Sequence, residues 1–267
     1  MQRILSALLC YLVAGAVYAA SPLKVCFDDW PPYAGYDART GFSGITVALM
    51  RDLFGSLGIR IHFKSATQAR CLAEARQGLT DVVLFSRREN LPGWRLTEVP
   101  TEFWLIGAWV PLNAPQRRFE SISQFRDMRV GTVRDYIYPA PIAGFRDWRV
   151  TQVGDAIDAL RQLSARRIDV VFDDVFWGQR MAAEKKLRIR MLEPLVAAEP
   201  EAHLYHPRHA LLFSQFESLL NEAIRSGEVD RRYRESLGLS YDAVRKGHYH
   251  QAFLPTEANS LWSKKVK

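Results

Sequence analysis

One stretch of this sequence occurs twice in degenerate form. Residues 72–85 read LAEARQGLTDVVLF and residues 160–173 read LRQLSARRIDVVFD, with an Asp nine residues after the first Leu in both copies. Each copy is an amphipathic stretch followed by a short apolar run, the pattern of a helix that leads into a buried strand. The repeat therefore predicts two similar α/β units within one chain.

The intervening sequence alternates short apolar runs with amphipathic stretches, which predicts βαβ units and mostly parallel sheets. Ser43 is expected to cap the first helix, and Gly58 is expected to end it. A second strand that opens a lobe is expected near Met128, where it echoes the first. The expected strands and second helix cover residues 23–27, 59–63, 67–77, 81–85 and 128–133.

Two segments are expected to cross between the units, the apolar run 103–110 and the Pro/Glu-rich run 193–201. The fold class is thus α/β, with two lobes that each hold a mostly parallel sheet flanked by helices. Ligands of open α/β sheets bind beyond the carboxyl ends of the strands, so we expect a ligand cleft between the lobes. The expected units are a first lobe of residues 20–109 and 198–239, a second lobe of residues 110–197, and a basic, solvated tail of residues 240–267.

The first 19 residues are typical of a cleavable signal peptide. Arg3 precedes an apolar run that ends in Val17-Tyr18-Ala19, and we expect cleavage after Ala19. A membrane anchor is the alternative, but the run is shorter than the roughly 20 residues that a span requires. The mature protein is therefore expected to be exported, which in a bacterium means the periplasm.

The charge of the chain gives little reason to expect a nucleic-acid partner. The formal charge is +7, and cleavage would remove one cation, Arg3. Half of the remaining excess lies in residues 240–267, and the other cations are dispersed without interleaved aromatic residues. An anionic membrane surface is an alternative contact for the tail. We expect a monomer with no nucleic-acid partner.

The mature chain would retain two cysteines, Cys26 and Cys71. The periplasm permits disulfides, so we expect these residues to pair, with two separately buried thiols as the alternative. Closing a loop of this length would stabilise the fold by roughly 4 kcal/mol in the chain-entropy model.

Short motifs along the sequence resemble those of a family, the bacterial extracellular solute-binding proteins of the polar amino-acid type (family 3), which serve ABC importers. The resemblance runs from about residue 23 to residue 239, and the order and spacing of its short motifs carry it. It implies a type II periplasmic-binding-protein fold of two lobes that close on a small polar solute. The motifs cover residues 28–33, 44–47, 78–89, 130–133, 159–160 and 167–174.

The resemblance also implies roles for individual residues. Arg88 matches the family's carboxylate-binding Arg, with Ser86 as a neighbouring donor, and Asp174 matches the acid that receives the ammonium group. Trp30 matches the aromatic residue that stacks on the solute. A guanidinium, a carboxylate and an aromatic face are the groups that a buried zwitterion requires. The structural alternatives are a solvated Arg pair, a helix cap for Asp174 and a core position for Trp30.

Other candidates are less directly matched. Asp28 or Asp29 lies where some members place a second acid for a side-chain cation. The turn at Ser86 is shorter than the family's, so Arg87 is an alternative to Arg88 as the residue that faces the cleft. Tyr33 belongs to the same motif as Trp30 and is a further candidate.

The second lobe departs from the family pattern. Arg134-Asp135-Tyr136 replaces the usual Gly-Ser/Thr-Thr turn, so Tyr136 is a candidate contact and Arg134 is a candidate second anion clamp. A dicarboxylate, another anion or a ligand without an amino group is therefore an alternative to an amino acid.

No metal or cofactor is expected. His203, His206 and His209 are spaced by three, but Pro207 interrupts them and no acid or Cys stands at ligand spacing. No Walker loop, GxGxxG, GxSxG, HExxH or SxxK motif occurs.

The sequence thus predicts a non-enzymatic periplasmic solute-binding protein that delivers an amino acid or related organic acid to an ABC permease. A ligand-binding subunit of a sensory receptor or kinase system is one alternative. A second is an enzyme on the same scaffold that resembles periplasmic cyclohexadienyl dehydratases, with Asp174, Asp28 or Glu102 as candidate general acids.

Overall fold

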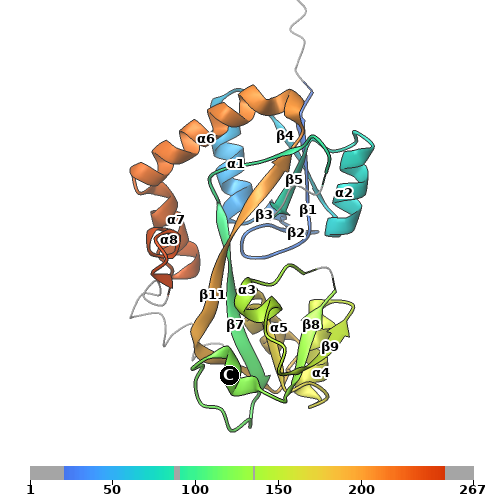
Figure 1. Ribbon diagram of the computed structural model, residues 1–267. Coiled ribbons are helices and arrows are strands. Elements are labelled where there is room, and N and C mark those ends of the chain that lie inside the picture. The colour runs from blue at the N-terminus through green and yellow to red at the C-terminus, as the bar shows by residue number, and fades with distance from the viewer. Residues whose placement is uncertain (1–20, 87–90, 135, 250–267) are drawn as a thin grey trace, which may run out of the picture.

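The computed structural model describes residues 21–86, 91–134 and 136–249, which form two groups of elements joined by two long strands (Figure 1). We call the groups the first lobe and the second lobe. The first lobe contains β1 Leu23–Phe27, β2 Gly35–Asp37, β3 Gly41–Ser43, α1 Ile45–Ser56, β4 Ile61–Ser65, α2 Gln68–Arg76, β5 Val82–Ser86, β6 Arg95–Leu96, η2 Pro207–His209, α6 Ala210–Arg225, α7 Glu228–Leu237 and α8 Tyr241–Arg245. The second lobe contains η1 Ile122–Phe125, β8 Arg129–Val133, α3 Ala140–Ala143, β9 Arg149–Val153, α4 Ala156–Ser164, β10 Val170–Asp174 and α5 Val175–Glu184.

The connecting strands are β7 (Glu102–Pro111) and β11 (Ile189–Tyr205), which pair antiparallel along most of their length. The strand order is β4-β1-β5-β11-β7-β10-β8-β9, with β6 beside β11. In the first lobe β1 pairs parallel with β4 and β5, and in the second β8 pairs parallel with β9 and β10. The predicted α/β fold with mostly parallel sheets is therefore confirmed, and the two expected crossing segments lie within β7 and β11 (Figure 1).

Local sequence signals place most of the element boundaries. The strand predicted for residues 23–27 is β1, and the helix predicted for residues 67–77 is α2 together with its caps. The predicted cap at Ser43 is wrong, because the residue before α1 is Gly44, with φ of 120°. A Cβ on Gly44 would lie 2.2 Å from the carbonyl oxygen of Tyr33, so only glycine fits this turn.

Each lobe buries its own hydrophobic cluster. In the first lobe Phe54 of α1 stacks on Phe216 of α6, with ring centroids 4.6 Å apart. In the second lobe Phe172 of β10 packs against Phe125 and Trp148. The two cores also touch, because Val175 of the second-lobe helix α5 belongs to the first-lobe cluster.

The folded first lobe extends beyond residue 239, into the segment expected to be the tail. Residues 241–245 form α8, Tyr241 is fully buried, and its hydroxyl donates a hydrogen bond to the carbonyl oxygen of Pro100 at 2.6 Å. The boundary at residue 239 is therefore wrong, because the hydrophobic pair Tyr241 and Val244 belongs to the core of the first lobe. The remainder of the expected tail, residues 250–267, lies outside the described residues, as do residues 1–19 with the expected signal peptide. Within the described part of the chain, no helix combines the length and apolar character that a bilayer crossing requires.

Candidate functional site

Asp173 and Asp174 end β10, where the second lobe faces the first. Both residues are 2% exposed. Asp174 is the N-cap of α5, and its Oδ1 accepts a hydrogen bond from the backbone N–H of Trp177 at 2.7 Å. The structural alternative for Asp174, a helix cap, is thus realised. The cap uses one oxygen only, because Oδ2 has no hydrogen-bond partner.

Burial shifts the protonation of both carboxyls. It raises the pKa of Asp174 to about 8, and the charge of Asp173 adds to the rise, although the backbone N–H of Trp177 and the Trp30 side chain oppose it. Burial also raises the pKa of Asp173 to about 7. A buried carboxyl with no partner on one oxygen is costly when ionised, so these positions favour a proton or a positively charged partner.

Trp30 lies where the two lobes meet. It packs against the hydrophobic cluster of the first lobe and against that of the second, and it contacts Asp174. Its ring lies 4.7 Å from that of Tyr33 and 5.0 Å from that of Phe85. We call the region formed by Trp30, Asp173 and Asp174 the lobe junction.

Tyr33 is not available to a solute in this structure. Its side chain is fully buried, and its hydroxyl donates a hydrogen bond to the carbonyl oxygen of Phe103 at 3.0 Å. Its predicted role as a ligand contact is therefore corrected: the aromatic ring belongs to the core, and the hydroxyl joins the first lobe to β7.

Three aromatic rings border the junction from the second lobe. The rings of Tyr136 and Tyr138 each lie 5.6 Å from that of Trp104, and 6.1 Å from one another. Tyr136 is 45% exposed. Burial of its hydroxyl, with the charges of Asp173, Asp28 and Asp174, raises its pKa well above the usual value. One of these charges, that of Asp28, belongs to the first lobe.

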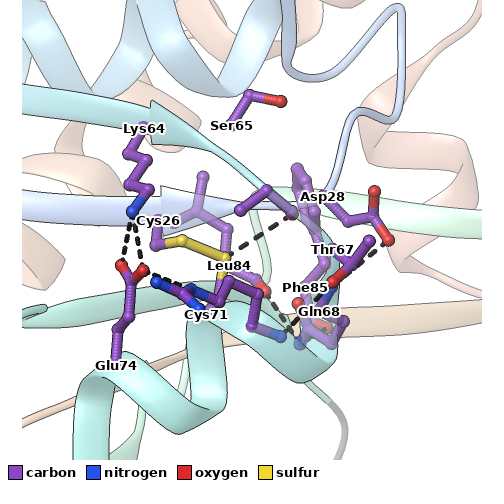
Figure 2. Close-up of a disulfide and its surroundings, with 12 residues drawn as sticks. Cys26, Asp28, Lys64, Ser65, Thr67, Gln68, Cys71, Glu74, Leu84 and Phe85 are labelled. Atoms are coloured by element: carbon purple, nitrogen blue, oxygen red, sulfur yellow. Dashed lines mark hydrogen bonds and ion pairs between the residues drawn. A yellow bond between two sulfur atoms is a disulfide. The ribbon is translucent and has the colours of Figure 1, made fainter. Parts of the chain in front are cut away.

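Polar side chains also lie near the strand ends of the first lobe. Asp28 is exposed, and its carboxylate accepts a hydrogen bond from the backbone N–H of Gln68 at 3.3 Å. The Gln68 side-chain amide donates to the carbonyl oxygens of Leu84 and Phe85 at 3.3 and 3.1 Å, as Figure 2 shows. Phe85 adopts a left-handed φ of 59°, which is unfavourable for an aromatic residue. Gln68 therefore holds a strained turn at the end of β5.

The predicted disulfide between Cys26 and Cys71 is confirmed. It joins β1 to α2 one turn beyond Gln68, and both sulfurs lie in a small apolar cluster (Figure 2). Glu74 on the same helix accepts hydrogen bonds from Lys64 and Arg70. The helix that carries Gln68 is thus fixed to the sheet by the disulfide and by the Lys64–Glu74 ion pair.

The other predicted site residues have different positions. Ser86 is buried, and its hydroxyl accepts a hydrogen bond from Gln68 at 3.3 Å. Asp29 is exposed and accepts a hydrogen bond from Ser65 at 2.7 Å. Arg134 is exposed, at the end of β8. Arg87 and Arg88, the expected carboxylate clamp, lie outside the described residues.

A buried polar cluster lies where β7 and β11 enter the first lobe. Glu102 and His203 are fully buried, with Oε1 and Nδ1 3.5 Å apart. Thr46 donates to Glu102 at 3.0 Å, and Thr101 lies 2.7 Å from Nε2 of His203. Burial raises the pKa of Glu102 to about 8 and lowers that of His203 to about 3, so both side chains are neutral near pH 6.

Two hollows formed by described residues lie on the first lobe, and neither contains a predicted site residue. One is lined by Pro32, Gly44, Ile45, Ala48, Arg231, Arg232 and Ser236. The other is lined by Ala75, Arg76, Gln77, Gly78, Leu91, Pro92, Trp94 and His206. The lobe junction is not one of them, because Trp30 packs against both lobes there.

Sequence reasoning gives no role in the candidate site to Asp173 of the lobe junction, or to Trp104 and Gln68 near it. Asp173 was placed inside a strand, although a second acid at the end of a buried strand was a usable signal. Trp104 belongs to a run assigned only as a crossing. Gln68 had no sequence signal, because its role depends on the turn after β5.

Comparisons with known proteins add to this geometry. No protein-family model matches the sequence, and a search of curated proteins finds no match. Among solved structures, a probable amino-acid ABC transporter extracellular-binding protein from Bacillus subtilis is 17% identical, with a TM-score of 0.68, and the match covers 82% of this chain and 98% of that one. A histidine kinase sensor domain with similarity to periplasmic binding proteins is 21% identical (TM-score 0.67), with 81% and 96% covered. An ancestral arginine-binding protein bound to arginine is 18% identical (TM-score 0.64), with 83% and 100% covered. The chain therefore has the periplasmic-binding-protein fold.

Proposed function

We propose that this protein binds a small polar solute, an amino acid or a related organic acid, at the lobe junction and has no catalytic activity. The observation that carries the proposal is the meeting of Trp30 of the first lobe with Asp174 of the second at the ends of the parallel strands. This is the edge where open α/β sheets bind ligands. The solved relatives, which include an amino-acid transporter protein and an arginine-bound protein, support the same class of ligand.

Binding at this place requires the lobes to separate and close again. Trp30 packs against both hydrophobic clusters, so a solute enters only when that contact opens. β7 and β11 are the two segments that pass between the lobes, and we assign the hinge to them (Figure 1). Closure would be a population shift driven by contacts that the solute makes with both lobes at once.

The partner of the closed form is proposed to be an ABC permease, with the protein exported to the periplasm by residues 1–19. The disulfide supports export, because such bonds persist in oxidising compartments. A second candidate is a sensory partner, which the likeness to a histidine kinase sensor domain favours. Capture of the closed, solute-bound protein by a permease or by a sensor receptor in membranes of the source bacterium would distinguish the two.

Solute binding itself is tested by a thermal-shift screen of refolded mature protein against amino acids, dicarboxylates, polyamines and aromatic acids. A ligand at 100 times its Kd should stabilise the fold by about 2.7 kcal/mol. Trp30→Ala should abolish the shift, because it removes the residue shared by the two lobes, whereas Tyr36→Ala, an exposed aromatic residue of the β2–β3 hairpin, should leave it unchanged. Absence of any shift across the panel would contradict the proposed function.

A further inference from the structure

The positive charge of the folded lobes is concentrated on the second lobe. Residues 110–197 hold 15 Lys and Arg against 11 Asp and Glu, whereas residues 20–109 and 198–239 hold 15 against 16. Two of the 11 acids, Asp173 and Asp174, are buried at the lobe junction, and burial raises their pKa values to about 7 and about 8. The surface of the second lobe is therefore more basic than the residue count alone indicates.

Five exposed cations lie in the two turns that follow α4 and α5. We call them the distal basic cluster: they are Arg166, Arg167, Lys185, Lys186 and Arg188. The backbone N–H of Arg188 donates a hydrogen bond to the Ser164 hydroxyl at 2.9 Å. The segment that leaves α5 therefore runs beside the end of α4, and the two turns form one surface.

The distal basic cluster lies at the end of the second lobe that is remote from the first lobe. β9 and β10 run parallel, and α4 and α5 follow them, so both helices run back from the lobe junction and end at the opposite edge of the sheet. β7 leaves the first lobe and ends at Pro111 at the same remote end (Figure 1). The next residue, Leu112, donates its backbone N–H to the carbonyl oxygen of Arg188 at 2.8 Å. The cluster is therefore separate from the proposed solute site.

Among the described residues, none of the five cations takes part in an ion pair. The acids next to them along the chain have other partners. Asp169 pairs with Arg129 at 2.6 Å, and Glu184 pairs with a cation of its own helix at the same distance. The negative ends of the α4 and α5 dipoles favour nearby positive charge, but Arg188 belongs to neither helix. Like charges held together repel one another, so the cluster favours a negatively charged partner from outside these residues.

An exposed apolar side chain accompanies these cations. Leu112, beside Arg188, is 48% exposed. Cations on separate turns around an apolar side chain suit a layer of lipid headgroups, because lipid charges are spread over a surface and an apolar side chain can enter the boundary with the acyl chains. A protein partner would have to place an acid opposite each cation. We propose that the distal basic cluster binds the phosphate groups of an anionic lipid surface. The proposal goes beyond solute binding and does not depend on it.

The test is cosedimentation of the full mature protein with two kinds of lipid vesicle. One kind is phosphatidylcholine alone, and the other is phosphatidylcholine mixed with an equal amount of phosphatidylglycerol, which is anionic. At about 0.02 M salt the protein should bind the anionic vesicles at least about tenfold more tightly than the neutral ones. Binding should weaken at about 0.15 M salt, because the range of the attraction between exposed charges shortens.

Two pairs of substitutions locate the binding surface. Lys185→Gln with Lys186→Gln should weaken binding to the anionic vesicles at least about tenfold, because each cation near such a surface adds to the attraction. Arg60→Gln with Arg225→Gln removes the same charge from exposed positions of the first lobe and should change binding by less than about twofold. Circular dichroism checks that both variants are folded.

Three results would overturn the proposal. The first is equal binding to both kinds of vesicle, or an equal loss from the first-lobe pair. The second is a loss of binding from Lys264→Gln with Lys265→Gln, which changes the expected tail, while the cluster variant binds like the wild type. The third is retention on immobilised poly-L-glutamate without binding to anionic vesicles, which would indicate an acidic protein partner instead. Solute binding in the thermal-shift screen is measured without vesicles, so its outcome is independent of all three.

Discussion

The two lobes share an α/β pattern but hold their strand ends by different means. In the first lobe, the turn after β5 is held by Gln68, a residue of another element, and the helix that carries Gln68 is fixed by the Cys26–Cys71 disulfide. In the second lobe, Asp174 caps the helix that follows it in sequence. The Gln68 contact joins distant segments of the first lobe, whereas the Asp174 cap spans three residues.

Because of this difference, we expect the removal of a contact to destabilise the two lobes by different amounts. A local cap forms with its helix and costs little entropy to position, whereas a contact between distant elements exists only after the lobe has folded. We therefore expect the removal of one such contact to lower stability more in the first lobe than in the second. The predictions below test that expectation, from the largest effect to the smallest.

Removal of the disulfide should have the largest effect. Replacing Cys26 and Cys71 together by Ala should lower the free energy of unfolding by roughly 4 kcal/mol, since the unfolded chain gains the freedom of an open loop. Urea denaturation monitored by circular dichroism measures this loss. Wild-type protein with a reducing agent is the control, and it should show a similar change. A loss under about 1 kcal/mol would mean that α2 stays in place without the disulfide, held by contacts such as the Lys64–Glu74 ion pair.

Loss of the Gln68 side chain comes next. Gln68→Ala leaves the buried carbonyls of Leu84 and Phe85 without their donor, so it should cost about 2 kcal/mol and weaken solute binding. Gln77→Ala, at the other end of α2, is the matched control and should change neither property by much. If Gln68→Ala lowered stability but left affinity unchanged, the turn after β5 would have no part in binding.

Loss of a helix cap in the second lobe should lower stability less. Asp155→Ala removes the hydrogen bond from the side chain to the backbone N–H of Asp158 and should cost about 1 kcal/mol. Asp155→Asn keeps an acceptor and should recover most of that loss. Chemical denaturation of the two variants side by side gives the comparison, and a loss from Asp155→Ala as large as that from Gln68→Ala would contradict the expected difference between the lobes.

The smallest effect at about pH 4.5 is expected at Glu102, where β7 and β11 enter the first lobe. Its folded pKa of about 8 exceeds the usual 4.5, so the stability that its proton provides is complete below about pH 4.5 and is lost as pH rises through 8. Glu102→Gln mimics the protonated form and should change stability by less than about 1 kcal/mol at about pH 4.5, where Glu102 is protonated in the folded protein and half-protonated in the unfolded one.

The melting temperature at about pH 6 and about pH 8 tests the role of Glu102. Wild-type protein should lose more stability across this interval than Glu102→Gln does. Asp173 and Asp174, whose pKa values are raised in the same direction, leave a residual slope in the variant. His203 does not contribute to the interval, because its pKa is lowered and its effect lies between about 3 and 6.5. An equal fall in both proteins would show that Glu102 does not titrate here.

Much of the fold followed from local patterns. The internal repeat predicted two α/β units, and residues 23–27 form the strand expected there. The exceptions have identifiable causes. Ser43 has the chemistry of a cap, but Gly44 takes that position because the backbone of Tyr33 passes too close for a side chain. The predicted start of the tail at residue 240 is wrong because it rests on the charge of residues 240–267. The side chains of Tyr241 and Val244 pack into the core of the first lobe.

The candidate site was less accessible to sequence reasoning. Trp30 and Asp174 contact one another at the lobe junction, and the solute-binding roles that the resemblance implies for them stay predictions. Tyr33, from the same motif as Trp30, points into the core instead, because its hydroxyl bonds to β7. Asp173 stands beside Asp174 at the end of a buried strand, which is a sequence signal, but only the structure shows that its carboxyl is buried.

The sequence by itself determined the α/β repeat, the helix signals at Thr67 and Asp174, and the two cysteines that pair, because these depend on residue order or on chemistry that few residues share. Only the tertiary structure decided that Gln68 holds the turn at Phe85 and that Asp173 and Asp174 keep unpartnered oxygens between the lobes. The physical reason is that hydrogen-bond satisfaction and desolvation are set by all the groups that surround an atom in space, and most of those groups lie far from it along the chain.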